Sequence, residues 1–307
     1  MSEAEDRTEA RYVQDRPTRR GYRVSDDALA IWAEIKRLGL ESNIAELDTL
    51  GYTVVPPEKA APPGFAERLK EAILEVVVRR GKIRPDLLEG LEYRDPPVPF
   101  GENFSYLLFE NRVFQEAVCN PVVDCLVTYL LGRSAVLSNC LAFLKGPGED
   151  DLGLHADHVY VPAPFPSQAQ VCNATWALTD YDRDSGAVCF VPGSHTLGRH
   201  PEAGDGMEER VAIEAPAGSL LFWHGATWHG AFARRRPGVR INLINAFMRM
   251  HMRPQEPYRE HVTPDILAAN PPILATRLGQ HVHYGWKEEG PDYARLGTAP
   301  AAQHRWD

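Results

Sequence analysis

Two residues able to bind a divalent metal lie two positions apart in the run Leu154-His155-Ala156-Asp157-His158. On an extended strand, residues i and i+2 point to the same face, so the His155 imidazole and the Asp157 carboxylate would project together. One nitrogen and one oxygen ligand in this arrangement suit a metal such as Fe(II). His158 has the opposite parity, and we expect its side chain to point away from the metal.

A third ligand could come from the run FWHGATWHG at 222–230, which follows a predicted buried strand. This run contains His224 and His229, which are five positions apart and would face opposite ways on one regular strand. Either histidine could complete a facial triad of two imidazoles and one carboxylate. Such a triad leaves three sites of the iron open for a chelating co-substrate and for O2.

Arg240 favours His229 over His224 as that third ligand. It lies in a strand-like run directly after the Pro237-Gly238 turn. We expect His229 and Arg240 to lie on adjacent antiparallel strands of one hairpin. A buried guanidinium there could bind the far carboxylate of 2-oxoglutarate through two parallel hydrogen bonds. Three further arginines, at 234–236, fall in the turn itself, and we expect them to be solvated.

The elements that would position these residues begin with a mostly helical part at 25–132. Its helix-like stretches carry apolar residues at three- and four-residue spacing and end at glycine. The predicted helices cover 25–39, 42–51, a segment opened by Pro62-Pro63 and closed by Gly81, 111–119 and 121–131, and a strand is predicted at 52–55. We expect residues 1–20 to form a disordered tail because charged residues dominate them.

From residue 135 the pattern changes to short apolar runs separated by glycine and proline turn signals. The predicted strands are Ala135–Leu144, Val159–Val161, Gln170–Leu178, Ala187–Val191, Val211–Ile213, Ser219–Trp223 and Val239–Met248. Helices before strands predict a single α+β domain over 21–307, in which helices buttress a β-sandwich or barrel at 135–250. Residues 251–307 return to helical patterns and are predicted to form a C-terminal helical extension.

The chain resembles the phytanoyl-CoA dioxygenase family of Fe(II)/2-oxoglutarate-dependent oxygenases. The matching stretches are HADHVYVPAPFP at 155–166, NATWALTDYDRDSGAVCFVPGSH at 173–195, GSLLFWHGATWHGA at 218–231 and the arginine of VRINL at 239–243. The resemblance implies a double-stranded β-helix, which is a jelly-roll, cupin-like core. It also implies that His155, Asp157 and His229 bind the iron and that Arg240 binds the co-substrate.

The same resemblance implies that Trp176 lines the co-substrate pocket and that Lys145 lies near it. Pocket walls in the family come from the helical N-terminal part and from loops near the metal strands. The candidate substrate-binding residues are Asn103, Phe104, Tyr106, Asn139, Tyr160, Asn173, Trp223 and Asn242. This mixture of aromatic and amide side chains suits a small to mid-sized, partly polar organic molecule.

The reaction implied by the resemblance consumes 2-oxoglutarate and O2, releases succinate and CO2, and oxidises a substrate. Related halogenases lack the carboxylate of the metal triad, so the presence of Asp157 favours hydroxylation. Desaturation, epoxidation and ring formation use the same site and stay open. The main alternative is a metal-dependent cupin-like isomerase or hydrolase that does not use 2-oxoglutarate. Arg240 argues against it, because a buried arginine facing the metal has no evident purpose there.

The composition of the chain limits the classes of binding partner that we expect. The chain has 307 residues and a net charge of -9, which disfavours nucleic acid and anionic membranes. No apolar run reaches the roughly 20 residues that span a bilayer, and the charged N-terminus does not read as a secretory signal. The five cysteines include no C-x-x-C pair and indicate buried, reduced thiols. We therefore expect a cytoplasmic enzyme, monomeric or homodimeric, that acts on a small molecule.

Overall fold

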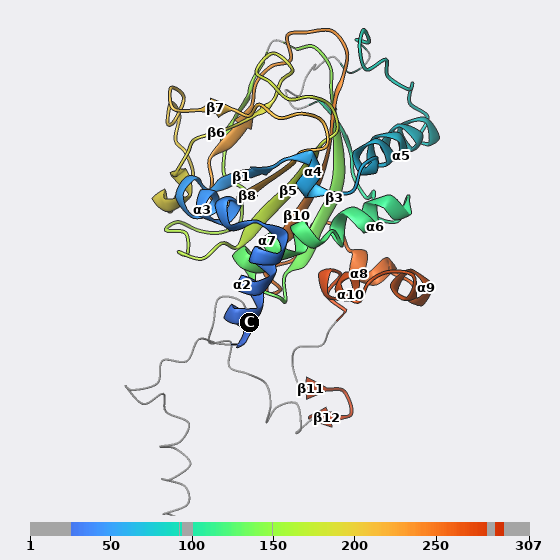
Figure 1. The fold of residues 1–307 in the computed structure, drawn as a ribbon, viewed down its shortest axis with the longest axis vertical. Helices are drawn as coiled ribbons and strands as arrows, with labels where there is room; N and C mark the ends of the chain where they lie inside the picture. Colours follow the sequence, from blue (N-terminus) through green and yellow to red (C-terminus); the bar gives the residue numbers. More distant parts are fainter. Residues whose placement is uncertain (1–25, 92, 94–100, 149, 281–285, 292–307) are drawn as a thin grey trace, which may run out of the picture.

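A sandwich of two antiparallel sheets forms the centre of the molecule, and a layer of helices covers the outer face of the larger sheet (Figure 1). This computed structural model describes residues 26–91, 93, 101–148, 150–280 and 286–291. The disordered tail predicted at 1–20 lies outside these residues. The predicted α+β class and the jelly-roll core are confirmed.

The larger sheet has six strands in the order β1-β8-β5-β10-β3-β2, all paired antiparallel. They are β1 (Tyr52–Val55), β2 (Glu102–Phe104), β3 (Val136–Lys145), β5 (Val171–Ala177), β8 (Leu220–His224) and β10 (Arg240–Met248). Successive side chains of a strand point to opposite faces. Each central strand therefore sends one set of residues toward the helices and the other set toward the smaller sheet.

The smaller sheet has four strands in the order β4-β9-β6-β7. They are β4 (Leu152–His155), β6 (Val188–Phe190), β7 (Val211–Ala212) and β9 (His229–Ala231). A cluster of buried side chains that includes Tyr181, Phe190 and Trp223 joins the two sheets. This packing holds β4 and β9 opposite the inner face of the larger sheet.

Helices of the N-terminal part form the main hydrophobic core with the outer face of the larger sheet. They are α2 (Asp26–Leu38), α3 (Glu41–Leu50), the short α4 (Pro57–Ala60), α5 (Phe65–Arg79), α6 (Arg112–Val118) and α7 (Pro121–Leu131). The apolar stripe predicted for α5 is buried, from Phe65 through Leu69 and Ile73 to Val76. The helices therefore buttress the β-core as the pattern predicted.

The chain after β10 packs three short helices beside α6 (Figure 1). They are α8 (Tyr258–His261), α9 (Pro264–Ala268) and α10 (Ile273–Arg277), and a small hairpin follows with β11 (Trp286–Lys287) and β12 (Gly290–Pro291). The fully buried Arg277 ties α10 to α7 through a 2.5 Å ion pair with Asp124. In the described residues, the predicted helical extension is helical only between 258 and 277.

Some element boundaries differ from the predictions. The helix expected to open at Pro62-Pro63 begins at Phe65, and the short helix α4 was not predicted. The predicted strand Val159–Val161 is a turn, in which the Val161 N–H donates to the His158 carbonyl over 2.9 Å. Strand β2 was not predicted because it is short and lacks an apolar run, and the strands expected at His155 and His229, which are β4 and β9, were predicted without bounds. Among the described residues, no helix is both long and apolar enough to cross a bilayer.

Candidate metal centre

His155 and His229 lie side by side on neighbouring strands of the smaller sheet. His155 ends β4, His229 begins β9, and the two residues are direct partners in the antiparallel register. Their ring centroids are 4.2 Å apart. The Asp157 carboxylate reaches the same point, with Oδ1 3.8 Å from His155 Nε2 and Oδ2 3.3 Å from His229 Nε2. One ligand atom from each residue lies within 4.8 Å of the others, as a shared metal would require.

Backbone carbonyls fix the tautomer of both imidazoles, so that Nε2 of each ring can bind a metal. His155 Nδ1 lies 3.0 Å from the Gly153 carbonyl oxygen, and His229 Nδ1 lies 3.0 Å from the Thr227 carbonyl oxygen. A carbonyl can only accept, so each Nδ1 carries the proton and each Nε2 keeps its lone pair for a metal. Burial lowers the pKa of His229 to about 4, which keeps its ring neutral.

Asp157 is held from the opposite sheet. Its backbone lies just past the end of β4, where its N–H donates to the Gly225 carbonyl over 2.7 Å. Its Oδ2 accepts a 2.6 Å hydrogen bond from Asn173 Nδ2 and a 3.1 Å hydrogen bond from Trp223 Nε1. These contacts orient the carboxylate toward the two imidazoles. The spacing predicted Asp157 on the same strand as His155, whereas β4 ends at His155 and a bend at Asp157, together with these contacts, brings the carboxylate to the imidazoles.

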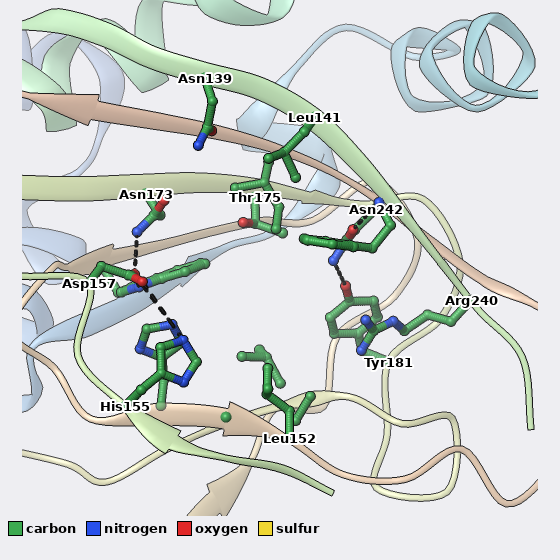
Figure 2. A pocket seen from close by; sticks show the side chains of 17 residues that line it. Asn139, Leu141, Leu152, His155, Asp157, Asn173, Thr175, Tyr181, Arg240 and Asn242 are labelled. Carbon is green, nitrogen blue, oxygen red and sulfur yellow. Dashed lines mark hydrogen bonds and ion pairs between the residues drawn. The ribbon is translucent and has the colours of Figure 1, made fainter. Parts of the chain in front are cut away.

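The triad lines one side of a cavity between the two sheets, which we call the metal cavity. Its volume is about 290 Å³, and Arg240 and Tyr181 lie on the other side (Figure 2). The lining residues are Asn139, Leu141, Phe143, Leu152, His155, Asp157, Asn173, Thr175, Tyr181, Val188, Trp223, His229, Gly230, Ala231, Arg240, Asn242 and Ile244. Apart from the metal triad, the lining contains a single charged residue, Arg240.

Arg240 is buried at the far end of the metal cavity, and its guanidinium has a donor that no protein group of the described structure accepts. Its Nη1 donates to the Gly186 carbonyl, and its guanidinium carbon lies 5.2 Å from the centre of the Tyr181 ring. Its Nε and the nearby Thr175 hydroxyl are buried without a hydrogen-bond partner in the described structure. A buried donor without a partner costs free energy, and a bound carboxylate would relieve this cost. The two ends of the cavity therefore fit a metal and the acidic end of a chelating co-substrate.

The predicted hairpin between His229 and Arg240 is wrong. His229 begins β9 of the smaller sheet, whereas Arg240 begins β10 of the larger sheet. The chain between them crosses from one sheet to the other and is anchored by Arg234. This arginine was predicted to be solvated but is buried, and its Nε donates to the Gly238 carbonyl over 2.8 Å. Arg240 therefore faces the metal residues across the cavity, where a molecule can lie between them.

The other candidate histidines do not reach the metal cavity. His224 ends β8, and its Nδ1 accepts the Ala226 N–H over 3.0 Å. Its ring packs near His158 and His195, at centroid distances of 5.6 and 5.4 Å. The buried His158 points away from the metal, as its parity predicted. None of the three lines the metal cavity.

The interpretation of Trp176 as a co-substrate residue is wrong, because its side chain points to the opposite face of β5. It is fully buried in the helix-side core, with its ring centroid 5.1 Å from that of Phe65. Asn173 and Thr175, which have the other parity, line the metal cavity instead. Lys145 is buried on β3 directly opposite Arg240 in the register, but it does not line this cavity.

Half of the candidate substrate residues line the metal cavity. These are Asn139, Asn173, Trp223 and Asn242. Tyr160 is exposed beside a neighbouring cavity. Asn103, Phe104 and Tyr106 line neither cavity, because β2 lies at the edge of the larger sheet beyond β3. Phe104 is buried in the helix-side core instead.

Two polar cavity residues, Thr175 and Tyr181, were missed. The alternation along β5 could have indicated Thr175, since it lies two positions after Asn173. Tyr181 lies in a loop, where no periodicity shows which way a side chain points. Its hydroxyl accepts a 3.0 Å hydrogen bond from Asn242 Nδ2 and packs this corner of the cavity beside Arg240.

Comparisons of sequence point to one family. The sequence model for phytanoyl-CoA dioxygenase (PhyH) matches residues 49–242. Dioxygenase af480 of Aspergillus fumigatus is 26% identical over 253 residues, which cover 80% of this chain and 79% of that protein. Dioxygenase cdmD of Talaromyces verruculosus is 28% identical over 148 residues, and the match spans only 48% of its length.

Solved structures share the fold at low identity. HygX from Streptomyces hygroscopicus, with nickel and 2-oxoglutarate bound, superimposes with a TM-score of 0.55 at 15% identity. That match covers 70% of this chain and 88% of HygX. The α-ketoglutarate-dependent epimerase SnoN from nogalamycin biosynthesis gives a TM-score of 0.53 at 21% identity, covering 69% of this chain and 84% of SnoN.

Proposed function

This chain belongs to the phytanoyl-CoA dioxygenase family of Fe(II)/2-oxoglutarate-dependent oxygenases, and we propose that it hydroxylates a small to mid-sized organic molecule with release of succinate and CO2. The observation that carries the proposal is the metal cavity. Two imidazoles and a carboxylate converge on one side of it, and a buried arginine with an unpaired Nε faces them from the other.

In this proposal, His155 Nε2, His229 Nε2 and the Asp157 carboxylate hold the metal. Three protein ligands leave the remaining positions of an octahedral ion free for co-substrate and O2. Bound there, Fe(II) supplies the redox chemistry by which O2 and 2-oxoglutarate oxidise a substrate. The part played by the protein is to bind, orient and exclude water around these molecules.

Arg240 has the role of binding the far carboxylate of 2-oxoglutarate. A guanidinium can hold a carboxylate through two parallel hydrogen bonds, and burial strengthens such an ion pair because water does not screen it. The Tyr181 ring beside the guanidinium limits how far Arg240 can move. A cupin-like isomerase or hydrolase, which does not use 2-oxoglutarate, would have no use for this arginine.

The choice of hydroxylation over other oxidations rests on Asp157. A carboxylate in the triad occupies the position that a halide would need, which argues against halogenation. Once a hydrogen has been removed from the substrate, hydroxylation needs no additional protein side chain to complete the product. SnoN, a fold relative, is an epimerase, so the reaction type has to be read from products rather than from the fold.

A direct assay can test the proposal. Protein purified without oxygen is given Fe(II), ascorbate, 2-oxoglutarate and air, and succinate is measured over time. We expect slow succinate formation that requires both Fe(II) and 2-oxoglutarate even before the substrate is known. In parallel, calorimetry with Ni(II) measures 2-oxoglutarate binding. Absence of both succinate formation and metal-dependent 2-oxoglutarate binding would overturn the proposal.

A further inference from the structure

A second and larger cavity adjoins the metal cavity, and we call it the outer cavity. Its volume is about 640 Å³, compared with about 290 Å³ for the metal cavity. Asn139, Asp157 and Asn173 line both. The metal ligand Asp157 therefore lies at the boundary between them. A molecule in the outer cavity would meet the metal from the side away from Arg240.

One face of the larger sheet forms the floor of both cavities. Along β10, Arg240, Asn242 and Ile244 line the metal cavity, and Ala246 and Met248 continue on the same face into the outer cavity. Arg240 and Met248 are eight steps apart along an extended strand, which corresponds to about 26 Å. A five-carbon diacid bound to Arg240 and the metal spans only part of this length. The outer cavity therefore has room for a different molecule.

The walls of the outer cavity are mainly apolar. Met248 and Val171 are buried on its floor, and Met252 and Pro254 line it from the segment after β10. Methionine side chains adapt their shape to an apolar ligand. Tyr160, which is 88% exposed, lies at its edge and offers an aromatic surface. These walls fit the carbon skeleton of a mid-sized molecule.

A single cation lies at the outer cavity. Among its described lining residues, Asp157 and Arg253 are the only charged ones. Arg253 is exposed, and within the described chain its guanidinium forms no hydrogen bond or ion pair. The neighbouring Asn139 amide is fixed instead by Gln255, with a 2.6 Å bond from Nδ2 to Oε1. The free guanidinium is therefore the group that could select a charged ligand.

We propose that the outer cavity binds the organic substrate and that this substrate is a mainly apolar molecule with a carboxylate-type anion held by Arg253. The inference rests on the proposed function. The anion would lie at Arg253, and the carbon to be oxidised would lie beside Asp157. One guanidinium suits a single carboxylate, which a planar fork binds through two hydrogen bonds. The several phosphates of a CoA thioester would need a cluster of cations, whereas the described lining of the outer cavity contains a single cation, Arg253.

A pair of matched fluorescent probes tests this site without knowledge of the substrate. Anilinonaphthalene sulfonate is an apolar aromatic anion, and N-phenylnaphthylamine has nearly the same skeleton without the charge. Each is titrated into the full chain, first without metal and then with Ni(II) and 2-oxoglutarate, so that the metal cavity is filled. We expect both probes to bind in both conditions, and the anion to bind more tightly.

Variants separate the charge from the apolar walls. Arg253→Gln should weaken the anionic probe about tenfold and leave the neutral probe unchanged, since a charge-assisted contact is lost. Arg259→Gln is the matched control, because Arg259 is exposed nearby but does not line the outer cavity; it should change neither probe. Ala246→Phe fills the floor and should abolish binding of both probes while Ni(II)-dependent 2-oxoglutarate binding shows that the protein is folded.

The outcomes distinguish this inference from the proposed function. An unchanged affinity of Arg253→Gln for the anionic probe, or an equal loss for both probes, would overturn the role of Arg253. Retention of both probes by Ala246→Phe would overturn the assignment of the cavity. Because the probe titration needs neither iron nor turnover, Arg253-dependent binding in a protein that forms no succinate would uphold the anion site and reject the oxygenase proposal.

Discussion

Asn173 and Trp223 are direct partners across strands β5 and β8, and both donate a hydrogen bond to the same oxygen, Oδ2 of Asp157. The two side chains belong to the larger sheet, whereas Asp157 follows a strand of the smaller sheet. Asp157, the proposed metal ligand, is thus held by the sheet opposite the one that carries the two histidines. The geometry of the triad therefore depends on how the two sheets pack.

Removing either donor should weaken metal binding without removing a ligand. We expect Asn173→Ala and Trp223→Phe each to lower the affinity for Ni(II) by about 10- to 100-fold, as is usual for groups that orient a metal ligand. Calorimetric titration of the purified variants measures this change. Thr175→Val is the control, since Thr175 lines the same cavity without contacting Asp157. Equal affinities for the wild type and both donor variants would contradict the orienting role.

Asp157→Ala should abolish 2-oxoglutarate turnover, because it removes the only carboxylate of the proposed triad. The fold should persist, since the carboxylate accepts hydrogen bonds from the larger sheet but forms no part of the hydrophobic core. Succinate formation reports the activity, and thermal unfolding followed by circular dichroism reports the fold. Full retained activity would exclude Asp157 from the ligand set.

Arg240→Ala should raise the 2-oxoglutarate concentration needed for half-maximal turnover by tenfold or more, the size expected for a lost charge-assisted hydrogen bond. The Fe(II) concentration needed for half-maximal turnover should change little, because Arg240 lies across the cavity from the triad. Both values come from succinate assays in which one component is varied. Equal effects on the two values would count against the assigned role.

The metal-free protein should lose stability as the pH falls from about 6.5 to about 4. Burial lowers the pKa of both His158 and His229 to about 4, so in this window the unfolded chain binds protons that the folded protein does not. Each histidine then contributes a slope of up to about 1.4 kcal/mol per pH unit, and below pH 4 the contribution levels off. Denaturant unfolding across this range measures the slope.

A matched variant isolates the contribution of His158. His158→Gln keeps an acceptor for the Gln170 N–H, which His158 Nε2 accepts over 3.3 Å, but cannot be protonated. The variant should therefore show a shallower fall in stability than the wild type in the same pH window. An identical pH dependence of the two proteins would show that the pKa of His158 is the same in the folded and the unfolded chain, which would contradict its lowering by burial.

Local patterns were enough to find the three candidate metal residues that the structure brings together. His155 and Asp157 were found from a spacing of two, and His229 from a histidine-rich run after a buried strand. The helices were predictable because an amphipathic stripe such as Phe65, Leu69, Ile73 and Val76 repeats within a short stretch. The jelly-roll core followed from short strands between turn signals and from the family resemblance. Apart from the jelly-roll core, each of these features is a pattern within one short stretch of the chain, although the stretches themselves lie far apart in the sequence.

Contacts between segments that lie far apart in the chain could not be predicted from local patterns. The prediction of a hairpin between His229 and Arg240 failed because nothing in residues 230–239 signals that the chain crosses to the other sheet. Trp176 was assigned to the wrong face because its role came from the resemblance rather than from the parity of β5. Arg234 was predicted to be solvated, although backbone carbonyls of the folded chain satisfy its guanidinium.

Residue types and short spacings thus indicate the chemistry of this protein, which is a site for one metal and one acidic co-substrate. Those spacings show which groups are available, because residues two apart in the chain stay close together whatever the local conformation. The distance between Arg240 and the triad, the hold of Asn173 and Trp223 on Asp157, and the outer cavity beyond them come from packing one sheet against the other. Such packing depends on the fit of many side chains at once, and no short stretch of sequence contains that information.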